Sequence, residues 1–585
     1  MPSTTALLTA LTGLNANARN IDVIGNNIAN INTTAFKSNR MMFSNMFSRT
    51  VSGGTPPADT TGGTNPFQVG YGVKISGTQR DFTNGAITTT GDSRDLAVEG
   101  DGFFVVTRGD ETLYTRDGSF RQNSSNDLVT IGGEKLRGYG VDSDFNIIAG
   151  SLTDINVPLG GMPIASATEN VTISGNLKAD GALPTAGSSL GLGSSNTAGF
   201  AAISGATPPL GPGNLLEVTT RLIDIEDPAQ AGSGTPLFAV GQTLEMRSAE
   251  KGNKTLSASS LVITASTTVQ DLATFLADSL GIDRTVGNNP DGATPGVTID
   301  PTTGRFSVVG NTGTANDLDI DQTDLRLLDS AGTVTGYPFI SAKAAAATGE
   351  SVRTTFVVYD SLGGTMDVDA TMVLDSRTST TTTWRYFIES SADSDVNSQA
   401  ATGTLVFDTD GRLQSTTPIA VSIDRAASGV TTPMSFDLSF FDDQTQLTSL
   451  ADDRSQMSAT FRDGAPIGSL AAFAVGQDGI VTGSFTNGLT RTIGQVALAT
   501  FSNNEGLVDV GGNMFRTGAN SGPAAMTTPG TLGAGRIVGG ALEASNVDMG
   551  EEFIKLIQAS TGYSASSRII RTTDELMQQL LVLGR

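Results

Sequence analysis

The feature that most constrains this chain is a pair of helical heptad patterns, one at each extremity. Near the N-terminus, apolar side chains recur at steps of three, four and seven residues: Leu7, Leu11, Leu14, Ala18, Ile21 and Ile28. This spacing predicts an amphipathic helix over about 5–30, with candidate N-caps among Ser3–Thr5 and an interruption at Gly25. A helix of this kind carries one apolar stripe, and that stripe has to be covered by something.

The C-terminal end repeats the pattern and predicts a second helix over about 547–583. Ser545-Asn546-Val547-Asp548 has the spacing of a capping box, and Gly562 is a point where the helix could soften. Heptad-compatible positions are occupied by two sets of side chains: Phe553, Leu556, Tyr563, Ile570 and Met577, and then Ile569, Leu576, Leu580 and Leu583.

The chain between these ends has the signals of short strands joined by tight turns. Residues 95–99 and 103–107 flank a Gly100-Asp101-Gly102 turn, and residues 113–115 precede Asp117-Gly118, which predicts hairpins. Residues 52–66 predict an exposed loop or linker, and the Gly/Ser/Ala/Pro-rich stretch 179–213 a domain boundary. The predicted fold class is therefore multidomain and mainly β, with an α-helical coiled-coil domain formed by the two terminal helices.

Composition excludes much chemistry. The chain has no Cys and no His, so it holds no Cys nucleophile, no Ser-His-Asp triad and no His metal ligand or base. A net charge of −24 argues against nucleic acid and anionic membrane as partners. No basic leader followed by an apolar run occurs, and Thr, Asn and Gly interrupt every apolar stretch, so we expect no cleaved signal peptide and no membrane insertion.

No motif predicts a catalytic, cofactor-binding or metal-binding residue. The chain has no GK dipeptide, so a P-loop is excluded. Asp408-Thr409-Asp410-Gly411 resembles the start of a calcium loop, but the twelfth position is Ile419 instead of Glu, which favours a hairpin turn. A glycosidase-like pair of carboxylates stays formally open, because the chain has many acidic residues and no spacing selects two of them. We therefore expect no enzyme activity and no cofactor.

The apolar stripes of the ends leave three possibilities open: the helices pair with each other, pack on the β body, or pack against neighbouring subunits. Burying some ten apolar side chains supplies about 15–30 kcal/mol per helix, whereas ordering each helix costs about 40–55 kcal/mol before hydrogen bonding contributes. A lone two-helix stalk is therefore marginal. We predict that the isolated monomer keeps both ends disordered and that they fold on assembly.

Three dense stretches carry a family resemblance. They are LLTALTGLNANARNIDVIGNNIANINTTAFKSNRMMF (7–43), then DLAVEGDGFFVV with LYTRDGSF (95–120), and finally GSFTNGLTRTIGQVALATF to GALEASNVDMGEEFIKLIQASTGYSASSRIIRTTDEL (483–576). In order and spacing they resemble the bacterial flagellar rod and hook family. Ala35 stands where that family usually has Gly, which should relax only a local turn. STGY and SAS replace the family's Gln-Arg-Ala-Tyr and Asn-Ala without changing the helix phase.

The resemblance implies a layered, non-enzymatic subunit of a helical homopolymer, and the large central insert favours a hook subunit over a rod protein. GTLVFDTDGRL (403–413) and TTFVVYDSLGG (354–364) are similar to the outer domain of hook proteins. The implied domains are a terminal helical core (1–33 with 541–585), a linker or extended region (34–90), an inner β domain (91–160 with 450–540) and an outer β domain (161–199 with 345–449). Residues 200–344 do not match the family, and we interpret them as an additional outer inserted domain.

The implied function is mechanical: a flexible hollow tube that transmits torque from rod and motor to filament and serves as an export conduit. The implied partners are copies of itself, the rod, the hook cap, the hook-filament junction proteins and the type III export apparatus. The implied location is the extracellular flagellar hook, reached without a cleaved signal. A distal rod or junction protein is the first alternative, and a secreted carbohydrate-binding or adhesive β protein is a remote one.

The subunit interface should lie on the terminal helices. The predicted interface residues are Leu7, Leu11, Leu14, Ile21, Asn27, Ile28, Phe553, Leu556, Tyr563, Ile570, Met577 and Leu580. Asn27 belongs to a set of asparagines in the first helix, where Asn is a poor interior residue. Two explanations stay open for this set: local capping near a frayed helix end, or hydrogen bonds between packed helices that fix their register.

Overall fold

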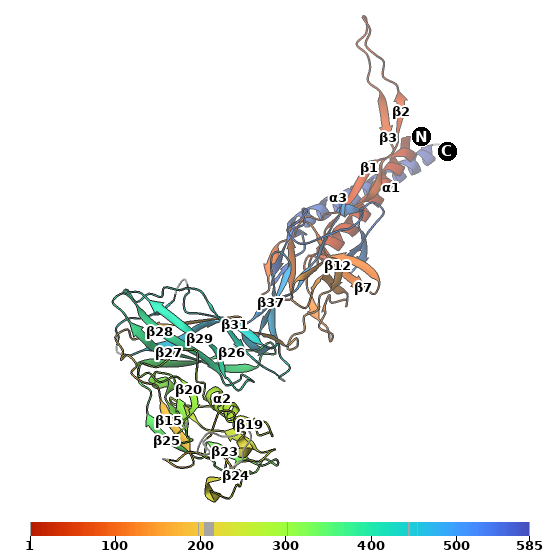
Figure 1. The fold of residues 1–585 in the computed structure, drawn as a ribbon. Coiled ribbons are helices and arrows are strands. Elements are labelled where there is room, and N and C mark those ends of the chain that lie inside the picture. Colours follow the sequence, from red (N-terminus) through yellow and green to blue (C-terminus); the bar gives the residue numbers. More distant parts are fainter. Residues whose placement is uncertain are drawn as a thin grey trace. The chain divides into compact units, whose positions relative to one another are not determined.

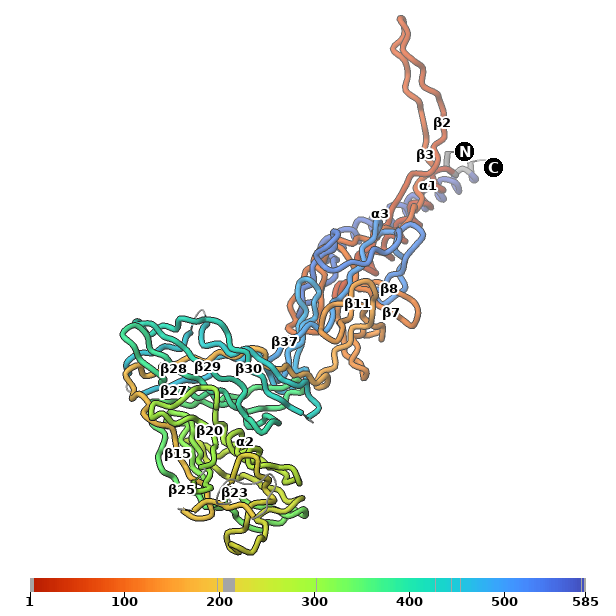
Figure 2. Tube along the Cα trace, viewed as in Figure 1, coloured from red at the N-terminus to blue at the C-terminus, as the bar shows by residue number. Residues whose placement is uncertain are grey.

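The computed structural model describes residues 2–583 except 197, 204–215, 301, 427, 443–444 and 453, with the side chains of 2–4, 580 and 583 also outside the description. Part of the predicted additional domain (204–215) and the Leu580 side chain therefore lie outside it. The chain forms two compact units, which are described separately: Met1–Pro163 with Ser469–Arg585, and Ile164–Gly468. Figures 1 and 2 show the course of the chain through each unit.

The first unit contains both terminal helices, α1 (Pro2–Ala29) and α3 (Met549–Leu583), packed side by side (Figure 1). The predicted helices are confirmed, with three local corrections. Gly25 and Gly562 interrupt neither helix. The cap of α3 is Asp548 rather than Ser545, because the Glu551 N–H donates to Asp548 Oδ1 at 3.0 Å. Helix α1 also starts earlier than expected, at Pro2.

Residues that follow α1 form a long antiparallel ribbon. Its two pairs of strands are β1 (Asn39–Asn45) with β4 (Val73–Arg80) and β2 (Ser48–Ser52) with β3 (Phe67–Gly70). In Figure 1 the β2–β3 hairpin extends away from the other strands of this unit.

The remaining strands of the first unit form a sheet of 13 strands and two small two-stranded sheets. Phe103, Tyr114 and Phe515 are among the residues of its core. The central path of the large sheet is β35 (Leu470–Val475), β36 (Ile480–Phe485), β37 (Thr490–Val496), β11 (Lys135–Val141), β7 (Phe103–Arg108), β8 (Glu111–Thr115), β40 (Met514–Arg516) and β39 (Val508–Gly511).

The predicted hairpin across Gly100-Asp101-Gly102 is wrong, although both of its strands exist. Strand β6 (Leu96–Glu99) pairs with β42 (Arg536–Gly539), and β7 pairs with β8 in the large sheet. The two glycines send the chain from one sheet to the other, with φ of 106° and 123°. A Cβ on Gly100 would lie 2.9 Å from the Gly535 Cα, so this close crossing of two backbones needs glycine.

The second unit contains two hydrophobic cores. The outer strands surround Trp384, Phe356 and Phe407, among others. These strands are β26 (Ser351–Tyr359), β27 (Thr365–Arg377), β28 (Thr382–Ser390) and β29 (Gln399–Phe407) in one sheet, and β30 (Ile419–Ile423), β31 (Met434–Ser439), β14 (Asn170–Asn176), β32 (Leu447–Thr448) and β33 (Gln456–Arg462) in another. Strand β33 thus pairs within this unit, whereas the sequence placed residues from 450 onwards in the inner domain.

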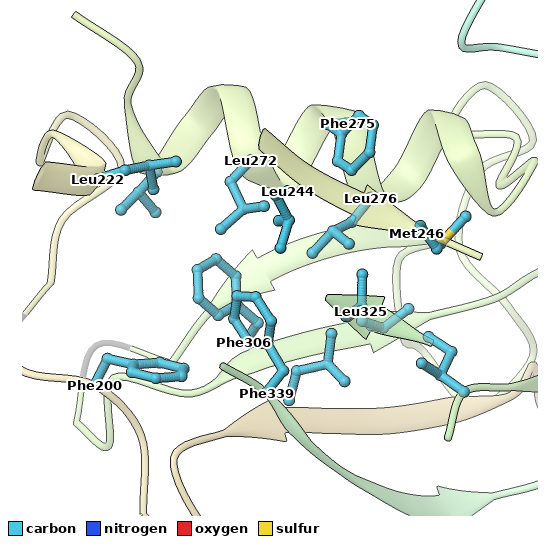
Figure 3. Close-up of a cluster of buried hydrophobic side chains, with 14 of the residues drawn as sticks. Phe200, Leu222, Leu244, Met246, Leu272, Phe275, Leu276, Phe306, Leu325 and Phe339 are labelled. Atoms are coloured by element: carbon cyan, nitrogen blue, oxygen red, sulfur yellow. The ribbon is translucent and has the colours of Figure 1, made fainter. Parts of the chain in front are cut away.

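The other core belongs to the segment from β15 (Ser189–Gly193) to β25 (Ile340–Ala345), here named the inserted region. Its elements are β16 (Thr243–Met246), β17 (Glu250–Lys251), β18 (Lys254–Thr255), β19 (Ser259–Val262), α2 (Val269–Ser279), β20 (Gly296–Ile299), β21 (Phe306–Val309), β22 (Leu318–Asp319), β23 (Leu325–Leu328) and β24 (Val334–Gly336). Figure 3 shows α2 laying Leu272 and Leu276 over Phe306 and Leu325. The mainly β fold class with paired terminal helices is confirmed.

Candidate functional site

The contact between α1 and α3 is made by small side chains. Ala10, Ala16 and Ala559 are at most 5% exposed. The helices approach so closely that a Cβ on Gly13 would lie 3.1 Å from Ser566 Oγ, and one on Gly562 would lie 2.9 Å from Asn17 Nδ2. Small residues at these positions let the two backbones come together, so the pair has little room between them for large side chains.

Hydrogen bonds fix the pair at its base, where Asn27 is 1% exposed. Its Nδ2 donates to Glu552 Oε2 on α3 at 3.2 Å and to the Asn39 carbonyl at 2.7 Å, while the Asn39 N–H donates back to Asn27 Oδ1 at 3.0 Å. Lys555 Nζ contacts the other oxygen of Glu552 at 2.9 Å. Asn27 therefore joins α1, α3 and β1 within one chain.

Many large apolar side chains of the pair are exposed, although Ile24 on α1 is buried at 3% exposure. On α3, Ile557 is 65% exposed and Val582 77%. Others that are at least a third exposed are Leu8, Leu11, Phe553, Ile554, Tyr563, Ile569, Leu576, Met577 and Leu581. Covering the exposed part of such a side chain is worth about 1 kcal/mol or more, so this surface holds roughly 10 kcal/mol of unused apolar burial.

The predicted interface residues all lie on this helix pair, in different environments. Leu11, Phe553, Tyr563 and Met577 are exposed, Asn27 is buried, and the Leu580 side chain is outside the described part. The other six are partly buried: Leu7, Leu14, Ile21, Ile28, Leu556 and Ile570. The small contact residues were missed, although Ala10, Gly13 and Ala16 recur at steps of three, a signal for close helix packing.

A buried ionic cluster, also missed, lies where the β body meets α3. Lys37 Nζ is 2.7 Å from Glu543 Oε1, and Arg116 Nη1 is 3.6 Å from Glu543 Oε2. All three side chains are at most 1% exposed. Burial lowers the pKa of both Lys37 and Arg116, while the Glu543 carboxylate opposes that shift. Lys37 also donates to the Thr83 carbonyl at 2.7 Å, so the cluster ties three distant parts of the chain together.

A groove of about 950 Å³ runs between the β2–β3 hairpin and the helix pair. Val51, Phe67 and Val69 line it from the hairpin, and Ile569 lines it from α3. Phe67 is 58% exposed, and the nearby Phe47 is 85% exposed. The first unit thus offers a second apolar surface next to the helices.

The described residues contain no group of three acidic side chains arranged to hold a metal ion. Among the described helices, none combines the length and the apolar character that crossing a membrane requires. Asp408 forms the predicted turn: its Oδ1 accepts from the N–H groups of Asp410 at 2.9 Å and Arg412 at 2.8 Å, and Gly411 has φ of 74°.

Comparison with known proteins gives matches along the whole chain. Four family models match: "Flagella basal body rod protein" (7–37), "Flagellar hook protein FlgE/F/G D1 domain" (97–179), "Flagellar basal body protein FlaE D2 domain" (327–465) and "Flagellar basal body rod FlgEFG protein C-terminal" (538–583). Together with the paired helices and their uncovered apolar surface, these matches define the class as an axial protein of the flagellar rod and hook.

Full-length relatives show which kind of axial protein the chain is similar to. The chain is 28% identical to the flagellar hook protein FlgE of Caulobacter vibrioides, with 100% of each chain covered. It is 27% identical to that of Treponema pallidum, with 99% of each covered, and 27% identical to that of Escherichia coli, with 98% of each covered. A crystal structure of Helicobacter pylori FlgE2 aligns with 77% of this chain at 15% identity and a TM-score of 0.35.

The chain belongs to the flagellar hook protein family. It is a structural, non-enzymatic subunit of the flagellar hook, and it polymerises with copies of itself in the flagellum.

Proposed function

We propose that copies of this chain stack through their terminal helix pairs into a hollow, flexible tube that transmits torque to the filament and conducts exported subunits. The observation that supports this most is that small residues lie buried between α1 and α3, while many large apolar side chains of the two helices stay exposed. A single chain leaves that surface in water, whereas a ring of copies covers it. The twelve predicted interface residues are proposed as part of this contact, and the groove beside the β2–β3 hairpin as a second part.

We further propose contacts at the two ends of the tube, with the rod on one side and the cap and junction proteins on the other. Export through the type III apparatus without a cleaved signal is part of the same proposal. The lack of Cys suits a chain that threads through a channel unfolded and works outside the cell.

The five-part division of the chain stays a proposal in the form given above. The separate cores of the inserted region and of the outer strands support treating them as two outer domains. The terminal helices are proposed as the innermost layer, because they carry many exposed large apolar side chains.

Electron microscopy of cells that lack this chain tests the place in the flagellum. Loss of the hook with an intact rod is the expected result, and loss of the distal rod would instead assign the chain to the rod. Limited proteolysis of the purified full chain, before and after polymerisation, tests the role of the ends. Trimming at both ends in the monomer and protection in the polymer are expected, while full protection of the monomer would count against the proposal.

A further inference from the structure

The second unit has two hydrophobic cores that share no residue. The inserted region packs around Phe306 and Leu276, and the outer strands pack around Trp384. Each core therefore supports its own part of the chain. Apolar packing within the cores does not explain what holds the two parts in one arrangement.

The chain crosses between the two parts only at neighbouring segments, residues 177–188 and 346–350. These segments bond to each other: Thr348 Oγ1 accepts from the N–H groups of Thr185 at 2.9 Å and Ala186 at 3.0 Å, and the Glu350 N–H donates to the Ala182 carbonyl at 2.8 Å. Two adjacent crossings of this kind form a hinge. A hinge alone permits rotation of one part against the other.

Away from the hinge, a lysine pair of the inserted region meets a carboxylate pair of the outer sheet. Lys251 and Lys254 are cross-strand partners on β17 and β18, and Asp369 and Glu389 are cross-strand partners on β27 and β28. Lys251 Nζ is 2.5 Å from Glu389 Oε1, with side-chain exposures of 2% and 8%. Lys254 Nζ contacts Asp369 Oδ2, whose side chain is 1% exposed.

Backbone carbonyl oxygens accept further hydrogen bonds from cationic side chains at this junction. Lys251 Nζ also donates to the Gly281 carbonyl of the inserted region at 2.7 Å. From the outer sheet, Arg353 donates to the Lys251 carbonyl at 2.8 Å and to the Ala315 carbonyl at 2.5 Å. Each part therefore supplies cations to oxygen atoms at the same buried junction.

Like charges that face each other directly across two strands repel. The carboxylates of Asp369 and Glu389 are such a pair, and so are the two lysines. Each pair loses its water when the two parts come together, and the opposite charges of the other pair compensate for that loss. The opposite charges therefore determine how the inserted region docks onto the outer sheet. Removal of one charged side chain leaves a buried charge without its ion-pair partner.

We propose that Lys251 and Lys254, held against Asp369 and Glu389, form a charge clasp that locks the inserted region onto the outer sheet as one rigid body. The clasp assigns a mechanical role to the inserted region, beyond the subunit function proposed above. With the clasp closed, the outer part of each subunit carries load without turning about its hinge.

Pulsed electron spin resonance on the full chain tests the clasp. The chain has no Cys, so A331C in the inserted region and S379C in the turn between β27 and β28, both at exposed positions, provide the only two label sites. The otherwise wild-type chain should give one narrow distance. K251M and R353M, each made separately, should lose that single distance and give a broad distribution.

Two controls keep the result interpretable. Lys343 pairs with Asp317 inside the inserted region at 2.9 Å, so K343M should keep the narrow distance. Trp384 is the chain's single Trp and is fully buried in the outer core, so its fluorescence reports whether that core stays folded in each variant. A narrow, unchanged distance in both K251M and R353M would overturn the clasp. A broad distance in the chain without these substitutions would overturn it as well.

Discussion

Helices α2 and α3 both carry large apolar side chains, but they pack them in opposite ways. Helix α2 buries Leu272, Phe275 and Leu276 in the core of the inserted region, at 5% exposure or less (Figure 3). Helix α3 buries Ala559 against α1 and leaves Ile557 65% exposed. An apolar stripe therefore indicates that a helix is covered by some partner. Small residues such as Ala559 indicate which face is covered by the same chain.

The two regions should therefore respond differently to the same kind of substitution. A large side chain lost from the inserted region removes stability from the single chain. A large side chain lost from the outer face of the helix pair removes stability only from the polymer.

The largest effect is expected in the inserted core. Phe306 is fully buried and lies edge-on to Phe339 with ring centroids 5.9 Å apart. F306A should lower the free energy of unfolding of this region by about 3–5 kcal/mol, because it leaves a cavity. Urea denaturation followed by circular dichroism measures this. V240A, at a position 61% exposed, is the control and should change little.

The next effect is expected at the ionic cluster beneath the helix pair. K37M leaves Glu543 buried without its ion-pair partner at 2.7 Å, with the Gly85 N–H and the more distant Arg116 remaining. A loss of about 3 kcal/mol in the stability of the first unit should follow. Thermal unfolding of the variant against K74M, which changes an exposed lysine of β4, gives the measurement. Equal stability of the two variants would show that the cluster does not anchor the helices.

On the outer face of the helix pair, a substitution should affect the polymer more than the monomer. I557Q should change the stability of the monomer by less than about 0.5 kcal/mol, because the side chain is exposed there and Gln is a good helix former. It should raise the critical concentration for polymerisation by roughly 10-fold or more, equivalent to about 1.5–3 kcal/mol of lost burial. Sedimentation of polymer at a series of protein concentrations measures it. If the variant polymerises as readily as the wild-type chain, neighbouring copies do not cover Ile557, and the expected difference between the two regions is contradicted.

Gly562 and Gly25 test how closely α1 and α3 approach each other. A Cβ on Gly562 would meet Asn17, whereas one on Gly25 would meet nothing within 4 Å. G562A should therefore cost about 1–2 kcal/mol through overpacking, and G25A should gain about 0.5–1 kcal/mol through helix propensity. Thermal unfolding of the polymer of each variant, in which both helices are folded, decides this, and a gain in both would mean that the helices are not in close contact.

The smallest effect concerns Ala35, which follows α1. Its φ is 56°, and its N–H donates to the Glu543 carbonyl at 2.8 Å. The family's Gly suits this left-handed conformation and Ala does not, so A35G should gain about 1 kcal/mol or slightly less. A melting temperature that falls on substitution would contradict this.

The long terminal helices and the family could be predicted from the sequence alone. Heptad spacing placed both terminal helices, and the strand signals around Phe356 and Leu405 correspond to β26 and β29. These features are local, because the periodicity of a segment depends on which of its faces is covered and not on what covers it.

Pairing between distant segments could not be predicted in the same way. Gly100 and Gly102 predicted a hairpin, but β6 pairs with β42 more than 400 residues away. The partners of Asn27, Lys37 and Arg116 lie equally far along the chain or depend on such pairings. The large heptad residues were predicted as the subunit interface, and the small residues in the contact between α1 and α3 were overlooked because they carry little hydrophobic signal.

A helical reconstruction of the polymer by electron cryomicroscopy tests the central claim most directly. The account predicts that Ile557, Ile569 and Leu581 on α3 are buried against helices of neighbouring copies, while Ala559 and Gly562 keep their contact with α1 of the same chain. A polymer in which those three large side chains still face solvent, with the copies joined through other surfaces, would contradict it.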